Sequence, residues 1–345
     1  MAPAPESDLA ERLAAYCRQR LPQADAVTVS ELQRIFGGGS RETWRFTLNE
    51  RQAGQDRVHA LILRRDPDTS LIDTQRRVEV TALRAFENSN VPVPRTWWLE
   101  EDPAALGHPF FVMQAVTGCE AGPLKLMAPP YAEHHARIAQ QKWTLLGHIA
   151  GHDPAALAGV TPAVDVDTAW RHELDHWGQV IERQARAPQP IAQAALRWLR
   201  AHPPPPAQRL SVVHGDYRTG NLLVAPDGQI RAVLDWELAH TGDPLEDLAW
   251  SFNRVWCFQR DDRVGGLASR QQAIAWWRAA SGLQVDERAL HWWELFNAVK
   301  GQGIWLGAAR AFEDGGGKDL LLAYAAWALT NSQDRAMLEL LGRLS

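Results

Sequence analysis

Two short segments in the second half of this 345-residue chain carry side chains that could do chemistry. The first is His-Gly-Asp-Tyr-Arg-Thr-Gly-Asn at 214–221, and the second is Asp-Trp-Glu at 235–237. A carboxylate such as Asp216 can accept a proton from an attacking hydroxyl group. Asn221 and Asp235 offer an amide oxygen and a carboxylate, which are ligands that Mg²⁺ prefers. These residue types indicate a reaction that needs a base and a hard cation.

The elements that must position these residues are short. Three strands are predicted at 211–213, 222–224 and 230–234, separated by a loop at 214–220 and a Pro-Asp-Gly turn at 226–228. The third strand ends immediately before Asp235. We therefore expect Asp216, Asn221 and Asp235 to leave the same end of one small hairpin system.

The spacing of the three polar residues matches that of protein kinases. There, a catalytic Asp accepts the hydroxyl proton, an Asn five positions later binds Mg²⁺, and a second Asp after a later strand binds Mg²⁺ between the phosphates. Asn221 follows Asp216 by five positions, and Asp235 follows Asn221 by 14. Either half alone would also fit an ordinary turn or a helix cap. Both halves in this order favour phosphoryl transfer.

On these motifs the chain resembles the aminoglycoside phosphotransferase and choline kinase-like superfamily. The family pattern His-Gly-Asp-Tyr/Phe-Arg-x-Gly-Asn stands at 214–221, and its Asp-Trp-Glu at 235–237. Its Gly-Asp-Pro-x-x-Asp-Leu-Ala follows at 242–249. The match is closest to bacterial phosphotransferases that resemble the kinase-like domain attached to some acyl-CoA dehydrogenases. The resemblance covers nearly the whole chain.

The resemblance implies an α+β protein with the two-lobed protein-kinase-like fold. Residues 1–113 would form an N-terminal lobe with an antiparallel sheet and helices. Residues 117–345 would form a mainly helical lobe with the catalytic loop and the acceptor site. The segment between them, 114–116, would be the hinge, where Gln114 and Val116 offer backbone groups to adenine.

The N-terminal half contains residues expected to hold the phosphates of ATP. A predicted phosphate loop consists of Gly37, Gly38, Gly39 and Ser40. Its backbone N–H groups could approach phosphate oxygens closely because glycine has no side chain. Arg64 occupies the place of the phosphate-binding lysine of kinases, and Glu79, in a helix predicted over 71–86, would orient it. Arg41 also departs from the family, which usually has Asn there, so a degenerate relative that binds no nucleotide stays open.

Further roles around the catalytic loop follow from the resemblance. Arg218, two positions after Asp216, would neutralise the transferring group, as a Lys often does in protein kinases. His214 would support the loop. Asp247, inside the following helix, would accept hydrogen bonds from the backbone of the loop without touching substrate.

The segment after Asp235 is short and leads into a helix. Only six residues separate Asp235 from Gly242, which leaves no room for a long activation loop controlled by phosphorylation. We therefore expect basal activity without an activating modification. Asp243 fits the N-cap of the next helix, and Glu246 would complete a capping box.

Composition fits one globular enzyme, with 46% hydrophobic and 22% charged residues. A formal net charge of −5 gives no hint of nucleic-acid or anionic-membrane binding, and no apolar run reaches membrane-spanning length. Three widely spaced cysteines suggest neither a disulfide framework nor a Cys-based metal site, and His148 with His152 lacks a matching third ligand. The first 21 residues predict an amphipathic helix, so we expect a cytoplasmic protein, for which a homodimer stays open.

We predict an ATP- and Mg²⁺-dependent enzyme that transfers the γ-phosphoryl group to a hydroxyl of a small molecule. The resemblance favours a hydroxyacyl compound or another non-antibiotic metabolite as acceptor. An aminoglycoside kinase is an alternative, which would need acidic pockets for several ammonium groups. A second alternative is a catalytically weak pseudokinase that binds nucleotide and acts through partners.

Overall fold

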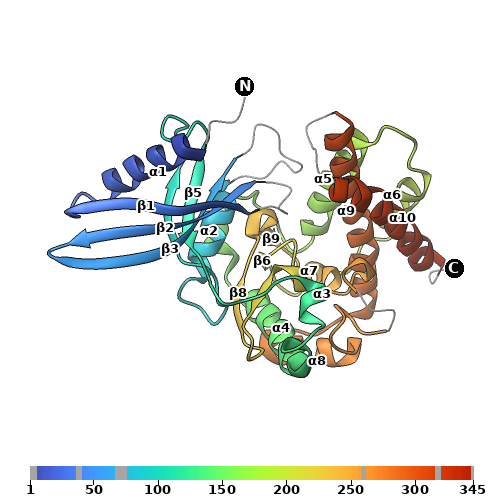
Figure 1. Cartoon of the computed structure of the whole chain (residues 1–345). Helices are drawn as coiled ribbons and strands as arrows, with labels where there is room; N and C mark the ends of the chain where they lie inside the picture. The colour runs from blue at the N-terminus through green and yellow to red at the C-terminus, as the bar shows by residue number, and fades with distance from the viewer. Residues whose placement is uncertain (1–5, 36–40, 67–75, 258–261, 315–319, 343–345) are drawn as a thin grey trace.

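The computed structural model describes residues 6–35, 41–66, 76–257, 262–314 and 320–342. A twisted antiparallel sheet with two helices lies on one side of the molecule, and a mainly helical part lies on the other (Figure 1). The α+β fold expected from the sequence is confirmed. No helix in these described ranges is long and apolar enough to cross a membrane.

The sheet has five strands in the order β1-β2-β3-β5-β4, all paired antiparallel. Its strands are β1 (Ala26–Ile35), β2 (Glu42–Gln52), β3 (Gln55–Arg65), β4 (Thr96–Glu100) and β5 (Phe110–Gln114). Successive side chains of a strand point to opposite faces, and one face of β2 carries the buried Trp44, Phe46 and Leu48, as their alternation predicts.

Each face of the sheet is covered by its own helix. Phe110 and Val112 of β5 pack into the cluster that includes α1 (Glu6–Arg20). Their neighbours Phe111 and Met113 pack into the cluster that includes α2 (Arg76–Phe86). The predicted helix over 71–86 is thus present from Arg76 onward, and its first five residues lie outside the described part.

The second part is built from eight helices within the described ranges. They are α3 (Pro123–Leu126), α4 (His135–Ala150), α5 (Ala169–Gln184), α6 (Pro190–Ala201), α7 (Leu245–Trp250), α8 (Arg270–Ser281), α9 (Glu287–Glu313) and α10 (Leu320–Gly342). Short 3-10 turns are η1 (Tyr131–His134), η2 (Pro154–Leu157), η3 (Thr219–Asn221), η4 (Trp236–Leu238) and η5 (Arg254–Trp256). The longest helix, α9, packs against α5, α6, α7 and α10, so it is the central helix of this part.

Two small sheets carry the predicted chemical residues. β7 (Leu222–Val224) and β8 (Ile230–Val233) form the expected hairpin, which holds Asn221 and Asp235 at its ends. β6 (Ser211–Val213), which precedes Asp216, pairs instead with β9 (His240–Gly242). The prediction of one hairpin system is therefore wrong for β6, because the chain after Asp235 returns antiparallel beside β6.

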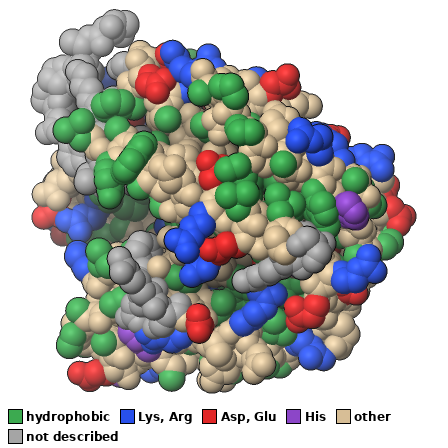
Figure 2. Space-filling view, turned by 90° about the vertical axis from the view of Figure 1, so that its right-hand side faces the viewer, with side chains coloured by type: hydrophobic (Ala, Val, Ile, Leu, Met, Phe, Trp, Pro, Cys, Tyr) green, Lys and Arg blue, Asp and Glu red, His purple; other side chains and the backbone are tan. Residues whose placement is uncertain are grey.

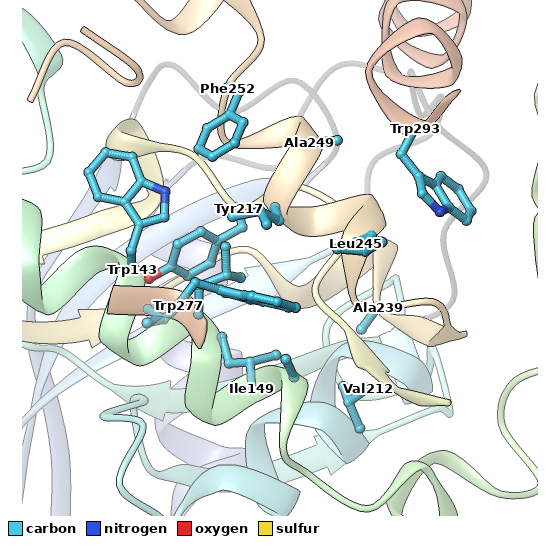
Figure 3. Packing of buried hydrophobic residues seen from close by; sticks show 14 of the residues in the cluster. Trp143, Ile149, Val212, Tyr217, Ala239, Leu245, Ala249, Phe252, Trp277 and Trp293 are labelled. Atoms are coloured by element: carbon cyan, nitrogen blue, oxygen red, sulfur yellow. The ribbon is translucent and has the colours of Figure 1, made fainter. Parts of the chain in front are cut away.

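The core of the helical part extends beneath the catalytic loop. Figure 3 shows Tyr217 of that loop lying between Trp143 and Trp277. The Tyr217 side chain is buried, and its hydroxyl donates to the carbonyl of Lys142 at 2.6 Å. Most tryptophans of this part are buried, as predicted, and so they pack in the core of the helical part.

The surface of the helical side carries mixed charge. Figure 2 shows Lys and Arg side chains interspersed with Asp, Glu and apolar side chains on this face. The described residues of this face therefore form no extended surface of a single charge sign.

Candidate active site

The backbone of the catalytic loop is fixed at its start. Gly215 has φ +84°, and a Cβ atom there would lie 2.3 Å from the carbonyl oxygen of Leu238, so only glycine fits. Asp247 of α7 accepts hydrogen bonds from the N–H groups of His214 at 2.6 Å and Gly215 at 2.9 Å. Burial raises the pKa of Asp247 to about 6, although these two bonds oppose the shift. The contact predicted for Asp247 is present.

His214 links the loop to the end of β8. Its Nδ1 accepts from the N–H of Asp216 at 3.1 Å, so Nε2 carries the proton and donates to the carbonyl of Leu234 at 2.9 Å. Burial lowers the pKa of His214 to about 4. A neutral imidazole therefore holds the two segments together at physiological pH.

The carboxylate of Asp216 is held by three side-chain donors. Its Oδ1 accepts from the indole Nε1 of Trp250 at 2.9 Å. Its Oδ2 accepts from Asn221 Nδ2 at 2.7 Å and from Arg218 Nε at 3.1 Å. The side chain remains 20% exposed. Asp216 is thus oriented by the protein and still accessible to a ligand.

Asn221 and Asp235 are brought together by the hairpin. The N–H of Leu234 donates to the carbonyl of Asn221 at 2.8 Å, next to Asp235 in the chain. Asp235 has φ 61° and ψ 59°, a left-handed conformation that Asp tolerates better than most residues, and its side chain is 39% exposed. Burial acts to raise the pKa of Asp235, but the cations of Arg64 and Arg218 outweigh it and the pKa is lowered.

The oxygen atoms of this pair fit a hard cation. Asn221 directs its side-chain nitrogen toward Asp216, so that contact does not use its amide oxygen. Asp235 uses Oδ1 to accept from Arg64, and that contact does not use its second oxygen. A carboxylate and an amide oxygen are suitable Mg²⁺ ligands.

Arg64 of β3 is buried against Glu79 of α2. Its Nη1 forms an ion pair with Glu79 and also donates to Asp235 Oδ1 at 2.8 Å, while its Nη2 lies 3.6 Å from Glu237. The ion pair expected between Arg64 and Glu79 is therefore present. A single guanidinium connects the sheet, α2 and the segment after β8.

Arg41 is a second cation at this position, which the sequence analysis noted only as a departure from the family. It is buried, its Nε donates to Glu79 at 3.1 Å, and it forms an ion pair with Asp66. Glu79 thus accepts from Arg41 and Arg64 together. No local pattern reveals this, because Arg41 and Glu79 are 38 residues apart.

The structure describes the predicted hinge but not the predicted phosphate loop. Gly37, Gly38, Gly39 and Ser40 lie outside the described residues. At the hinge, the N–H of Gln114 donates to Arg95 and that of Ala115 donates to Ala60. No hydrogen bond between described residues uses the N–H of Val116. Val116 is therefore the better candidate of the two predicted residues for pairing with adenine through its N–H.

Three tryptophan rings lie in a row that begins at Trp250, the residue that donates to Asp216 Oδ1. The indole rings of Trp250 and Trp256 have centroids 5.4 Å apart, and those of Trp256 and Trp305 lie 6.4 Å apart. The guanidinium carbon of Arg218 lies 4.9 Å from the Trp256 ring centroid, within cation–π range. Arg218 is therefore fixed between Asp216 and an aromatic wall formed by Trp250, Trp256 and Trp305.

The capping-box prediction for Glu246 is wrong. Asp243 does accept from the N–H of Leu245 at 2.9 Å near the start of α7. Glu246 does not reach back to the helix start; its buried carboxylate lies 2.9 Å from Lys300 Nζ and 3.0 Å from His240 Nε2. Glu246 forms these ion pairs in place of the predicted capping-box hydrogen bond, because a buried carboxylate without a cation would be costly.

Comparison with known proteins agrees with this geometry. The model of the phosphotransferase enzyme family matches residues 31–293. The chain belongs to this family. It is also similar to acyl-CoA dehydrogenase family member 10 of Mus musculus, with 30% identity over 226 residues. That match covers 64% of this chain and 20% of the mouse protein, so the chain corresponds to about one fifth of that relative.

Solved structures share the fold over nearly the whole phosphotransferase chain. A putative aminoglycoside phosphotransferase from Ralstonia eutropha superposes with a TM-score of 0.68 and 22% identity, covering 95% of this chain and 98% of that one. Aminoglycoside phosphotransferase APH(4)-Ia, in a ternary complex with ADP and hygromycin B, gives a TM-score of 0.57 at 18% identity and covers 94% and 98%. The kinase-like fold is confirmed by these likenesses.

Proposed function

We propose that this phosphotransferase moves the γ-phosphoryl group of ATP to a hydroxyl group of a small molecule, with Mg²⁺ as cofactor. The observation that carries the proposal is the environment of Asp216. Its carboxylate is fixed by Trp250, Asn221 and Arg218, yet its side chain remains 20% exposed. A base held in this way can align a hydroxyl for in-line attack.

The nucleotide would be held between the two parts of the molecule. Residues 1–113 form the proposed N-terminal lobe, 114–116 the hinge and 117–345 the C-terminal lobe. In this proposal Arg64 contacts the phosphates, together with the loop of Gly37 to Ser40, and Val116 pairs with adenine. Arg64 would exchange its bond to Asp235 for phosphate oxygens, because a guanidinium can grip either kind of anion.

Asn221 and Asp235 would hold Mg²⁺. When bound, the ion neutralises the negative charge of the phosphates and of the leaving nucleotide. Arg218 would add a positive charge near the transferring group, since it is fixed beside Asp216. Asp216 would accept the hydroxyl proton as the new oxygen–phosphorus bond forms.

The acceptor we propose is a hydroxyacyl compound or another non-antibiotic metabolite. Arg218, whose side chain is 28% exposed, lies over the largely buried Trp256 ring and suits an anionic or carbonyl group of the acceptor better than a polycation. The buried carboxylate of Glu246, behind the loop, is already neutralised by Lys300. The likeness to a protein named as an acyl-CoA dehydrogenase points in the same direction.

The test is an acceptor screen with [γ-³²P]ATP and Mg²⁺, comparing hydroxylated acyl compounds with aminoglycosides. Asp216→Ala is expected to lower kcat by about 10²-fold or more with little change in ATP affinity. Transfer to aminoglycosides alone would replace the proposed acceptor class. If ATP with Mg²⁺ neither turns over nor raises the melting temperature at saturation, the pseudokinase alternative is favoured, because a ligand specific for the folded state must stabilise it.

A further inference from the structure

A largely buried group of four ionisable side chains lies behind the catalytic loop. We call it the charge quartet: Glu173 of α5, His240 of β9, Glu246 of α7 and Lys300 of α9. Glu246 is fully buried and Lys300 is 1% exposed. Glu246 lies 2.9 Å from Lys300 and 3.0 Å from His240, and His240 lies 3.9 Å from Glu173.

The charges of the quartet balance. Burial alone would lower the pKa of His240, but Glu173 and Glu246 outweigh it and raise the pKa to about 10. Within the quartet two carboxylates therefore face one ammonium and one imidazolium at neutral pH. At the outer edge Glu173 also lies 3.1 Å from Nδ1 of the half-exposed His172. Glu173, His240 and Glu246 have the residue types of a metal site and lie close enough together for one. The ammonium of Lys300 already neutralises Glu246, so a metal ion is not required for charge balance.

The quartet reaches the catalytic loop through Lys300. Its Nζ donates to the carbonyl oxygen of Gly215 at 2.7 Å. The next N–H in the chain, that of Asp216, donates to His214 Nδ1 at 3.1 Å. Both polar groups of the peptide unit that precedes Asp216 are therefore held by buried side chains. Because this peptide unit fixes the direction in which the Asp216 side chain leaves the backbone, its orientation determines where the carboxylate lies.

We propose that Lys300 is a positioning residue for Asp216. Glu246 keeps the ammonium charged and in place, His240 holds the other oxygen of the Glu246 carboxylate, and the ammonium holds the Gly215 carbonyl. The consequence for turnover rests on the proposed kinase function, whereas the placement of Asp216 does not. Asp247 holds the N–H groups of His214 and Gly215, so Lys300 and Asp247 fix the same turn through opposite polar groups.

The placement is tested by NMR on protein labelled with [¹⁵N]asparagine. The side-chain amide of Asn221 donates to the carbonyl and carboxylate of Asp216 and therefore reports its position. The variant Lys300→Met/Glu246→Gln removes one charge of each sign, so it avoids leaving a buried carboxylate without its cation. Glu173→Gln is the matched control, because none of the hydrogen bonds among described residues joins Glu173 to the loop.

The double variant is expected to shift the Asn221 amide signal, and Glu173→Gln is expected to leave it in place. In [γ-³²P]ATP turnover with Mg²⁺, kcat of the double variant should fall by about 10-fold or more with KM for ATP nearly unchanged. An unmoved Asn221 signal, or a kcat loss no larger than that of Glu173→Gln, overturns the proposal. If wild-type protein shows no ATP turnover, the kinase function fails while the NMR result still decides the role of Lys300.

Discussion

Two buried groups of charged residues flank the catalytic loop, and they differ in how far they are closed. The group on the nucleotide side, which we call the arginine cluster, consists of Arg41, Arg64, Glu79, Asp235 and Glu237. It opens to solvent through Asp235, whose side chain is 39% exposed. The charge quartet opposite includes Lys300 and Glu246, whose side chains are almost fully buried.

Both groups combine basic and acidic side chains, so solvent exposure, rather than residue type, distinguishes the group proposed to bind ligand from the group proposed to position Asp216. In the proposed function Arg64 would exchange Asp235 for a ligand, because that carboxylate lies at the edge of the cluster. Lys300 has no such exchange, since its hydrogen-bond partners among the described residues, the Gly215 carbonyl and Glu246, both lie inside the protein. A closed ion pair gives little net stability, but it is costly to break on one side.

The largest effect is expected at the open edge. Asp235→Asn removes the charge of the proposed metal ligand without changing the size of the side chain, so turnover of ATP with Mg²⁺ should fall to background. The urea midpoint should stay close to that of the wild type, because the carboxylate is partly exposed. Steady-state kinetics and urea unfolding check the two parts. Near-normal turnover would contradict the assignment of Asp235.

The next effect is expected inside the closed quartet. Lys300→Met leaves Glu173 and Glu246 with only the His240 imidazolium between them and leaves the buried Gly215 carbonyl without its donor, which should cost about 3–5 kcal/mol of unfolding free energy. Arg64→Met should cost less, about 1–2 kcal/mol, because Arg41 still neutralises Glu79. Urea denaturation with linear extrapolation measures both values. Equal losses would remove the distinction between a closed and an open group.

Turnover of Arg64 variants should show a graded loss. Arg64→Met is expected to slow transfer by about 10- to 10²-fold, and Arg64→Lys should recover part of it because charge returns without the two-pronged geometry. Glu79→Gln should resemble a milder Arg64 defect. Initial rates at several ATP concentrations separate binding from turnover.

The double variant Arg64→Met/Glu79→Gln provides the control for this series. If the two residues act as one unit, the second change adds little to the first. Fully additive effects would mean that Glu79 does not orient Arg64, and that Arg65 or another cation serves the phosphates.

The smallest effect is expected in the pH dependence of stability. Two buried groups, His240 and Lys142, change the free energy of unfolding in opposite directions as pH rises. His240 has its pKa raised from 6.5 to about 10, so its contribution is complete below pH 6.5 and is lost as pH rises toward 10. Lys142 of α4 is fully buried and donates to Thr219 Oγ1 at 3.0 Å. Burial lowers its pKa from 10.5 to about 7, so stability increases as pH rises through that window.

The two substitutions should therefore change the slope of unfolding free energy against pH in opposite directions between about pH 7 and 10. His240→Gln removes a contribution that decreases as pH rises, and Lys142→Met removes one that increases. Urea midpoints measured at several pH values compare each variant with the wild type. Parallel profiles for the two variants would contradict the opposite pKa shifts of Lys142 and His240 in the folded protein.

Local sequence predicted a large part of the site. Asp216, Asn221 and Asp235 were identified by spacing, and the hairpin of β7 and β8 does bring the last two together. The alternation in β2 correctly predicted its buried face. These features depend on residues close in the chain, for which turn chemistry and side-chain alternation are sufficient. The roles of the site residues in catalysis stay predictions.

Sequence alone determined which residues stand at kinase-like spacing, because all three lie within residues 216–235. Only the tertiary structure decided what holds them. Trp250 is 34 residues from Asp216, and Lys300 is 85 residues from Gly215. Glu246 fitted a local helix cap, but pairs with Lys300, 54 residues away. Burial makes such distant charge pairing obligatory, and which partners meet depends on how α7 and α9 pack, which no local pattern records.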